Sequence, residues 1–449
     1  MRMANTTDFI NTVYDELGKL VGVGSGTSSS FMLMAWPGYS LSPADFKRAD
    51  APNGPYDPEV AKEAFSQLAN IVPSFNQARF ENSGFQVDDL YEIVLASAIP
   101  VGATETSVAT NPIYRLFADA GFEFAQARRG FHDDPSSFYY PAVATPNQWY
   151  DEAAAKGWAA ISLNQSDIKP APAKSAFVKA SGIDLSKAEV WRLKPTEAER
   201  ASVDDRIKKL VAAKAVAFGK SAALPSATKA AAPASRVFVA PTATAARASQ
   251  LSGVVAARPS AAGALASRAL FQRSSLPASA FQGKLDVKRA NLSKPDLGIA
   301  SLSQRLLLKS VIDRALPTRL PAPDTDGFHV SFRYCRVNIE RPWLKLALLN
   351  TKNWWMFDTP AGEYSSGASN ANPGMFPLLS TSFIAIRDLK ITANWKQEDK
   401  THLKSAASFG FFDLNGATVN NDTIEVKGLQ VIASICNLTP KLPPHSPPE

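Results

Sequence analysis

Residues 206–284 contain twelve Lys and Arg side chains and not a single Asp or Glu. The stretch is rich in Ala and Ser, and it has only four aromatic residues. Its five prolines argue against one long helix, because each proline removes an amide donor and clashes with the preceding helical turn. The residues that can build a hydrophobic core therefore lie on either side of this stretch.

The same stretch accounts for the positive charge of the chain. The whole sequence has 48 basic and 41 acidic residues, which gives a net charge of +7. Subtracting the twelve basic residues of the stretch leaves 36 basic against 41 acidic residues, a net charge of −5. The chain is therefore a mildly acidic body with a +12 segment, and such a positive segment attracts anionic partners.

We interpret residues 201–325 as a basic, acid-poor arm flanked by helices at about residues 198–220 and 303–316. Four of its arginines recur at intervals of 11, 11 and 10 residues: Arg236, Arg247, Arg258 and Arg268. A period of 11 residues keeps one face of a helix in register, which suits a repeated docking strip. An extended linker with solvated charges explains the same composition. If the arm docks on a partner, these arginines and Lys284 are its candidate contacts.

The sequence predicts that residues 1–200 form a mainly α-helical domain. Four capping residues stand directly before a proline: Ser42-Pro43, Asp57-Pro58, Asn111-Pro112 and Thr145-Pro146. A capping side chain accepts hydrogen bonds from the free amides of the first turn, and proline at the first helical position loses nothing by lacking an amide. Apolar residues at helical spacing, such as Ile10, Val13 and Leu17, support these helices.

Residues 326–440 are predicted to form an antiparallel β-sandwich, followed by an extended and exposed Pro-rich tail at 441–449. Apolar residues occupy the even positions from Phe328 to Tyr334 and the odd positions from Cys335 to Ile339. Such a change of phase is typical of a β-bulge, and a second change occurs around Gly428. One helix is expected near 398–407. The fold class is thus multidomain α+β, with a helical N-terminal region, an Ala/Pro/Ser-rich basic linker arm and a C-terminal sandwich.

We assign no catalytic, cofactor-binding or metal-binding residue from the sequence. The four histidines lack the spacing of a metal site. His132, Asp133 and Asp134 could bind a cation or act as a general base, but the same residues are typical of a turn after a helix. The segment with Gly22, Gly24 and Gly26 lacks the lysine of a phosphate-binding loop, so we interpret it as a connection between helices.

The densest apolar and aromatic stretch runs from Trp343 to Phe357 and includes Trp354 and Trp355. Trp and Lys together suit a membrane interface, where an amphipathic side chain keeps one end in water. The same residues suit a sandwich core or a subunit interface. Trp343, Trp354 and Trp355 are therefore candidate interaction residues under more than one interpretation.

Cysteine content and the start of the chain bear on the compartment. Cys335 and Cys436 are expected to be buried free thiols, because free cysteine behaves as a small hydrophobic residue. The first residues lack the uninterrupted apolar region of a signal peptide, and no run approaches the roughly 20 apolar residues of a membrane span. We therefore expect synthesis and folding in the cytoplasm, with later release left open.

Together these features favour a non-enzymatic structural or assembly protein without cofactors. Its basic arm would dock on a neighbouring subunit, through self-association or a larger assembly, or on another acidic surface. One alternative is a protein that acts on membranes or binds anionic lipid surfaces, and a second is a hydrolase whose site is assembled from distant residues. Nucleic-acid binding would be only weak and non-specific, because the arm lacks interleaved aromatic residues that stack on bases.

Overall fold

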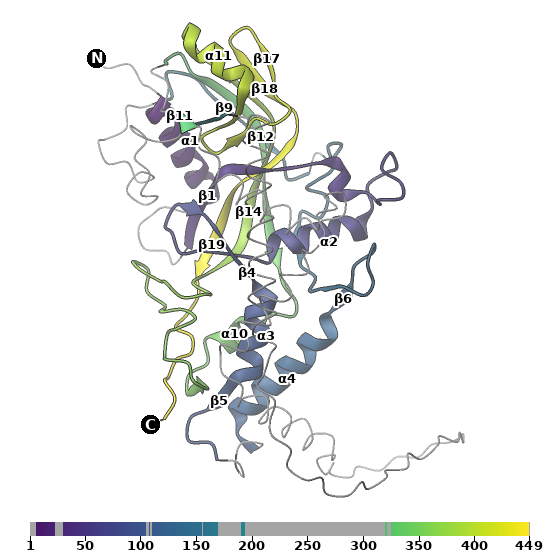
Figure 1. The fold of residues 1–449 in the computed structure, drawn as a ribbon, viewed down its shortest axis with the longest axis vertical. Coiled ribbons are helices and arrows are strands. Elements are labelled where there is room, and N and C mark those ends of the chain that lie inside the picture. Colours follow the sequence, from purple (N-terminus) through teal and green to yellow (C-terminus); the bar gives the residue numbers. More distant parts are fainter. Residues whose placement is uncertain are drawn as a thin grey trace, which may run out of the picture.

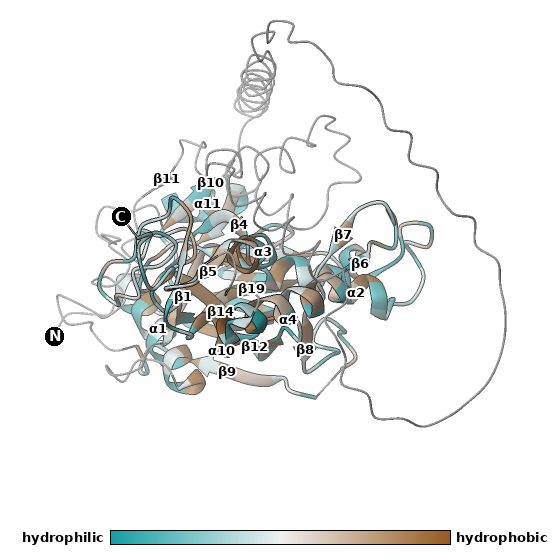
Figure 2. Ribbon diagram, turned by 90° about the horizontal axis from the view of Figure 1, so that it is seen from below, coloured by the Kyte–Doolittle hydropathy of each residue, from teal (hydrophilic) through white to brown (hydrophobic). Residues whose placement is uncertain are grey.

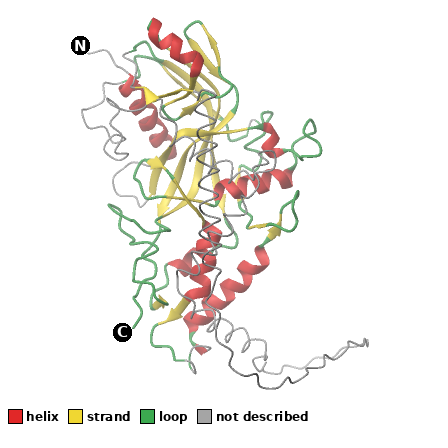
Figure 3. Ribbon diagram, viewed as in Figure 1, coloured by secondary structure: helices red, strands yellow, loops and turns green. Residues whose placement is uncertain are grey.

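The computed structural model describes residues 6–22, 30–104, 107, 110–154, 156–168, 190–193, 319–320 and 325–448. These residues form a mixed α+β fold with one large curved sheet and few helices (Figures 1 and 3). The helices expected at 198–220 and 303–316 lie outside the described residues.

The described helices are α1 (Thr6–Val21), α2 (Pro58–Ala69), α3 (Val87–Ser97), α4 (Pro112–Ala127), α10 (Leu346–Leu349) and α11 (Gln397–Ser405), with the 3-10 turn η1 (Pro43–Phe46). The strands before the basic stretch are β1 (Ser30–Leu41), β2 (Ile71–Pro73), β3 (Arg79–Phe80), β4 (Asn82–Gln86), β5 (Ala98–Pro100), β6 (Arg129–Gly130), β7 (Phe138–Tyr139), β8 (Val143–Thr145), β9 (Ala159–Leu163) and β10 (Trp191–Leu193). Those after it are β11 (Arg319–Leu320), β12 (His329–Glu340), β13 (Trp354–Met356), β14 (Leu378–Thr392), β15 (Ala406–Phe409), β16 (Phe412–Asp413), β17 (Thr418–Asn420), β18 (Thr423–Val426) and β19 (Leu429–Leu438).

Strand β14 is the centre of a nine-stranded sheet. One of its edges pairs with β12, and the other pairs with β19 and then with β18. Strand β1 pairs antiparallel with β19, so that Ser30 lies opposite Asn437, while β8 and β9 pair with β12. The sheet thus combines strands from both sides of the basic stretch. The regions that we expected to be separate domains, 1–200 and 326–440, share this sheet.

The expectation that 1–200 is mainly α-helical is wrong, because strands β1 to β10 lie in it and α1 is followed by β1 rather than by a helix. Pairing with distant strands, which helix caps and helical spacing do not report, decides the structure of these segments.

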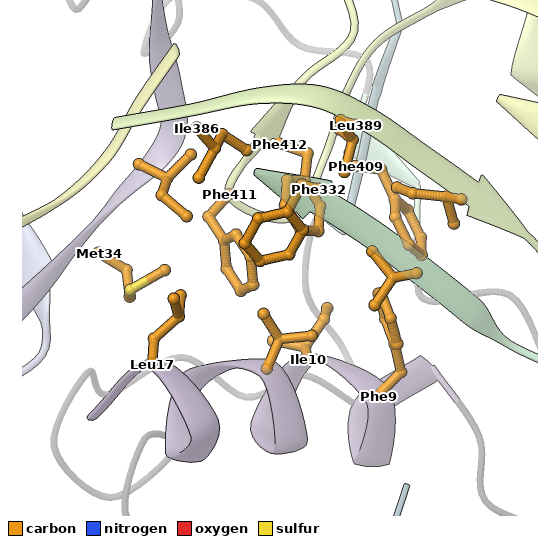
Figure 4. Packing of buried hydrophobic residues seen from close by; sticks show 14 of the residues in the cluster. Phe9, Ile10, Leu17, Met34, Phe332, Ile386, Leu389, Phe409, Phe411 and Phe412 are labelled. Carbon is orange, nitrogen blue, oxygen red and sulfur yellow. The ribbon is translucent and has the colours of Figure 1, made fainter. Parts of the chain in front are cut away.

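Each face of the sheet carries its own hydrophobic cluster. Alternate residues of a strand point to opposite faces, and β1 follows this rule. Met32 and Met34 join a cluster with Phe9, Ile10 and Leu17 of α1 (Figure 4). Leu33 and Ala35 join a second cluster that contains Phe65 and Leu68 of α2. Helices α1 and α2 therefore cover opposite faces, and Figure 2 shows the apolar residues concentrated on the strands between them.

The bulge expected in β12 is wrong. Phe328, Val330 and Phe332, at even positions, belong to the cluster under α1, whereas Cys335 and Val337, at odd positions, belong to the cluster under α2. Even and odd residues thus keep to opposite faces along the whole strand, and the apolar pattern changes phase because the two halves of β12 bury different faces. The step from Ser331 to Arg333 in β12 corresponds to three positions of β14, so the extra residue lies in β14.

The register has the irregularity that the sequence led us to expect near Gly428. Strands β18 and β19 follow one another along the same edge of β14. Leu389 lies opposite Val426 and Ile386 opposite Gln430. Three positions along β14 thus correspond to four positions along the segment that runs from β18 into β19. This segment therefore has one extra residue relative to β14. Helix α11 confirms the helix expected near 398–407.

Three of the four predicted capping sites are confirmed. Ser42, Asp57 and Asn111 cap η1, α2 and α4 with their side chains, and proline follows each of them. The fourth prediction is wrong, because Thr145 ends strand β8, where it lies opposite Asn338 of β12, and its bond to Pro146 is cis. Cross-strand pairing, which a local capping pattern does not report, decides the structure there.

The Pro-rich tail is not exposed throughout, contrary to the sequence expectation. Leu442 is fully buried, and its backbone pairs with Ser365 in both directions. Farther along, His445 donates its backbone N–H to the carbonyl of Trp354. The tail thus closes a third cluster, which contains residues of α3, α4, α10 and β13 (lower part of Figure 1).

Candidate functional site

The basic segment leaves and re-enters the described body at one place. Strand β10 pairs antiparallel with β11, so that Trp191 lies opposite Leu320 and Arg192 opposite Arg319. Residues 194–318, which contain the acid-free stretch, connect these two strands. We call this strand pair the neck.

The neck is attached to the core beneath the main sheet. Strand β10 also pairs with β15, and the carbonyl of the fully buried Val190 accepts a 2.8 Å hydrogen bond from the N–H of Gly410. The buried Arg192 donates from Nη2 to the carbonyl of Trp36, 3.0 Å away, in β1. A few residues after β11, the hydroxyl of Thr325 donates to Asp399 of α11 at 2.9 Å. Buried polar contacts of this kind fix the backbone on both sides of the segment.

This geometry changes the expected role of the segment. A linker between two domains would end far from where it began, whereas residues 194–318 begin and end on paired strands. The segment is therefore an insertion into one body. The candidate contacts Arg236, Arg247, Arg258, Arg268 and Lys284 lie outside the described residues, so they remain predictions.

The candidate residues Trp343 and Trp354 are part of the third cluster. Both side chains are buried, at 2% and 0% exposure. The indole N–H of Trp343 donates to the carbonyl of Pro141 at 2.8 Å, and that of Trp354 donates to the carbonyl of Thr351 at 2.7 Å. Their polar atoms are satisfied within the fold, as buried indoles require. Of the interpretations open from the sequence, core packing describes these two residues.

Trp355 differs from its neighbour, because its side chain is only half-buried. Its backbone pairs with Ile99 of β5 and forms a bridge with His445 of the tail. In the same stretch, Leu346 is 53% exposed and Phe357 is 47% exposed. The exposed apolar surface of this stretch is thus formed by these side chains rather than by Trp343 and Trp354.

His132, Asp133 and Asp134 lie in the connection between β6 and β7, which is a turn, as one interpretation of the sequence expected. The N–H of His132 donates to Glu63 at 2.5 Å, and its Nδ1 lies 3.1 Å from Asp133. Asp134 accepts hydrogen bonds from Ser136 and Ser137, which lower the pKa of its carboxyl group. The carboxylates therefore stabilise the turn.

Two further sequence expectations concern metals and membranes. Within the described ranges, no group of three or more His, Cys, Asp or Glu side chains could hold a metal ion. In the part of the chain that the structure describes, no helix combines the length and apolar character needed to cross a membrane.

Sequence reasoning missed the neck. Strands of two or three residues have no measurable period, so Trp191 and Leu193 on one side and Leu320 on the other gave no strand signal. The sequence feature that could have indicated the neck is the presence of apolar residues at both boundaries of the low-complexity segment.

Comparison with known proteins identifies no relative: no family model, no curated protein and no solved structure matches this chain.

Proposed function

We propose that the protein is a non-enzymatic assembly protein whose basic insertion docks on an acidic surface, either of a neighbouring copy or of a larger protein assembly. The observation that carries the proposal is the pairing of β10 with β11. The insertion is not needed to join two domains. We therefore infer that this long, positively charged segment makes contacts with a surface outside the body.

The charge distribution supports self-association in particular. The stretch 206–284 within the insertion has twelve basic and no acidic residues, and the chain outside that stretch has 36 basic against 41 acidic residues. A positive segment on one copy and an acidic body on another attract one another, and this attraction falls with ionic strength. Self-association through these contacts should therefore weaken as the salt concentration rises.

We infer that the body presenting the insertion is a sandwich. The cluster under the main sheet includes Val190, Phe409 and Phe412, which flank or belong to the second sheet β11-β10-β15-β16. The same cluster includes Ile384 and Ile386 of β14. Two sheets that share one apolar layer are the arrangement of a sandwich, and in this body the neck belongs to the second sheet.

Light scattering after size-exclusion chromatography tests the proposal. We expect assemblies larger than a monomer at about 50 mM salt and their dissociation at about 500 mM salt. A variant with the twelve basic residues of the stretch changed to Gln should be monomeric at both salt concentrations. A matched control that exchanges Lys for Arg and Arg for Lys in the same stretch keeps the charge and should behave as the parent. A parent that is monomeric at both salts, with the insertion readily cleaved by protease, would contradict the proposal.

Binding to an anionic lipid surface is the second candidate. It is favoured by the exposed side chains of Leu346 and Phe357, which lie close to Lys345 and Lys352 in sequence. Apolar side chains beside basic ones suit the boundary between headgroups and acyl chains. Co-sedimentation with vesicles that contain phosphatidylserine, at low salt, decides this candidate, because protein that stays in the supernatant excludes it.

A further inference from the structure

Three neighbouring strands change register at the same level of the main sheet. Relative to β12, strand β14 has one extra residue between Arg387 and Lys390, and the extra residue between β18 and β19 lies near Gly428, opposite the same part of β14. There Asp388 adopts a φ of 55°, a conformation that is uncommon for a residue with a side chain. Bulges often redirect a side chain beside a functional site. The residue redirected here is Arg387.

Arg387 is buried without an ion-pair partner among the described residues. It is 3% exposed, and its Nη1 and Nη2 donate to the carbonyls of Asp151 and Trp149 at 3.2 and 3.4 Å. Its Nε has no hydrogen-bond partner within the described chain. An arginine has five N–H donors, so the two carbonyls leave three of them unused. A buried guanidinium with unused donors is costly unless an anion or another acceptor meets it.

The surroundings of Arg387 add positive charge. Arg333 is its direct partner across β12 and β14, and like charges in such positions repel one another. The ring of Trp158 lies 4.1 Å from the Arg387 guanidinium and 5.7 Å from that of Arg333. Asp388 lies 3.9 Å from Arg333, and it and Glu152 favour the charged form of Arg387 without forming an ion pair with it in the described chain. Burial, reinforced by Arg333, outweighs these carboxylates and lowers the pKa of Arg387.

Arg387 lines a cavity of about 30 Å³ at the same place. Leu41, Phe46 and Leu429 supply apolar walls, and Tyr56 and Tyr150 contribute aromatic rings. Glu152, Lys427 and Gly428 complete the wall near the break between β18 and β19. One water needs roughly 10–15 Å³ of such space, so the cavity accepts a group of a few atoms.

We propose that this cavity binds a carboxylate, with the Arg387 guanidinium as its charged partner. A carboxylate matches the planar fork of an arginine, which can donate two parallel hydrogen bonds. The apolar walls suit the carbon chain behind the carboxyl group. A phosphate fits less well, because its four oxygen atoms and second negative charge would face the apolar walls and Glu152, whereas a carboxylate turns its carbon chain towards them. The ligand is either an Asp or Glu side chain of a partner protein or a free short-chain carboxylic acid, and binding does not depend on the basic insertion.

Saturation-transfer NMR on the full chain tests the proposal with propionate as the probe. We expect transfer to the methyl group of propionate in the parent. The Arg387→Met variant should bind at least about tenfold more weakly, the effect of losing a charge-assisted hydrogen bond. Arg48→Met is the matched control, because Arg48 is an exposed arginine paired with Asp50, and it should leave binding unchanged.

A second variant keeps every contact of Arg387. Gly428 lines the cavity, has no positive φ, and a Cβ added to it would meet nothing within 4 Å. Gly428→Leu should therefore place its side chain in the open space at the rim of the cavity, where it hinders entry and weakens transfer to propionate. Gly121→Leu is its control, because Gly121 also has open space around it and lies in α4.

Capped peptides distinguish the two sources of the carboxylate. Binding of Gly-Glu-Gly, but not of Gly-Gln-Gly, supports an acidic side chain from a partner protein. Binding of propionate without the Glu peptide supports a free carboxylic acid. The proposal is overturned if neither probe shows transfer, if Gly428→Leu and Arg387→Met bind propionate as the parent does, or if inorganic phosphate displaces propionate at equal concentration.

Discussion

Trp191 and Leu320 lie directly opposite one another in an antiparallel strand pair, although residues 192–319 separate them in the chain. Pairing of this kind is normally closed by a hairpin turn of a few residues. In this protein the turn is replaced by the whole basic segment. The body of the protein should therefore be able to fold without it.

Deleting the insertion tests this expectation. When residues 194–317 are replaced by Asn-Gly, a two-residue hairpin turn can connect Leu193 to Thr318 in the register of the neck. We expect a folded protein whose free energy of unfolding is unchanged or raised by up to about 3 kcal/mol, because closing a shorter loop costs less entropy. Urea denaturation followed by circular dichroism measures the change, and a twelve-residue Gly-Ser replacement is the control. An unfolded product of both designs would mean that the segment is part of the core.

Gln430 provides a buried contact between the two sheets. Its side chain accepts from the N–H of Asp413 at 2.9 Å and donates to the carbonyl of the same residue at 2.8 Å. Changing Gln430 to Leu would leave two buried backbone groups without this partner. We expect a loss of about 2–4 kcal/mol in the free energy of unfolding, measured by urea denaturation. Gln397→Leu, at the exposed start of α11, should change it by less than about 0.5 kcal/mol.

Arg341 connects helix α2 to the main sheet. It donates to the carbonyl of Ala69, to Oδ1 of Asn70 at 2.9 Å and to the carbonyl of Ser380 at 2.8 Å. Burial lowers the pKa of Arg341 to about 10, which leaves the guanidinium charged at neutral pH. Arg341→Met should therefore cost about 3–5 kcal/mol of stability, since it removes charged hydrogen bonds to buried acceptors. Arg48→Met removes only an exposed pair and should cost less than about 1 kcal/mol, so equal losses in the two variants would contradict this role.

The two adjacent tryptophans of β13 should respond differently to truncation. Trp354 is fully buried and its ring lies 5.1 Å from that of Phe117. Trp354→Ala should cost about 3–5 kcal/mol, the usual effect of emptying a large buried site, whereas Trp355→Ala should cost clearly less. Thermal unfolding compares the two variants. If Trp355→Ala is the more damaging, the assignment of Trp354 to the core is wrong.

The sequence predicted local features such as helix caps, but it did not predict which strands pair with one another. Asp57 and Asn111 could be identified as helix caps because capping acts over one turn. The apolar period of two identified β12 as a strand, but its change of phase came from burial on different faces in the two halves of the strand rather than from a bulge. The pairing of β1 with β19 could not be predicted, since it joins Ser30 to Asn437 through hydrogen bonds that carry no sequence signal. The neck and the Arg387 cavity depend on the same kind of long-range pairing. Arg387 itself is visible in the sequence as a charged residue that directly follows an apolar run of β14.

The thiols of Cys335 and Cys436 cannot form a disulfide in this fold, and both are free. Cys335 lies opposite Ala385 on one edge of β14, and Cys436 lies opposite Ser380 on the other edge. Five positions along β14 and two strand spacings put them roughly 20 Å apart, far beyond the reach of a disulfide. The expectation of two buried free thiols is thus confirmed.

These thiols should be unreactive in the native state and should weaken the fold at high pH. Burial raises the pKa of Cys335 to about 11 and that of Cys436 to about 12, from an ordinary value of 9.0. The folded state therefore holds its thiol protons more tightly than the unfolded state, so the free energy of unfolding should fall as the pH rises from 9 towards 12. At pH 8 we expect almost no reaction with a disulfide reagent in the native protein and rapid reaction of both thiols in denaturant, because the thiolate is the reactive form. Fast labelling of either native thiol at pH 8 would show that its side chain is accessible and contradict this placement.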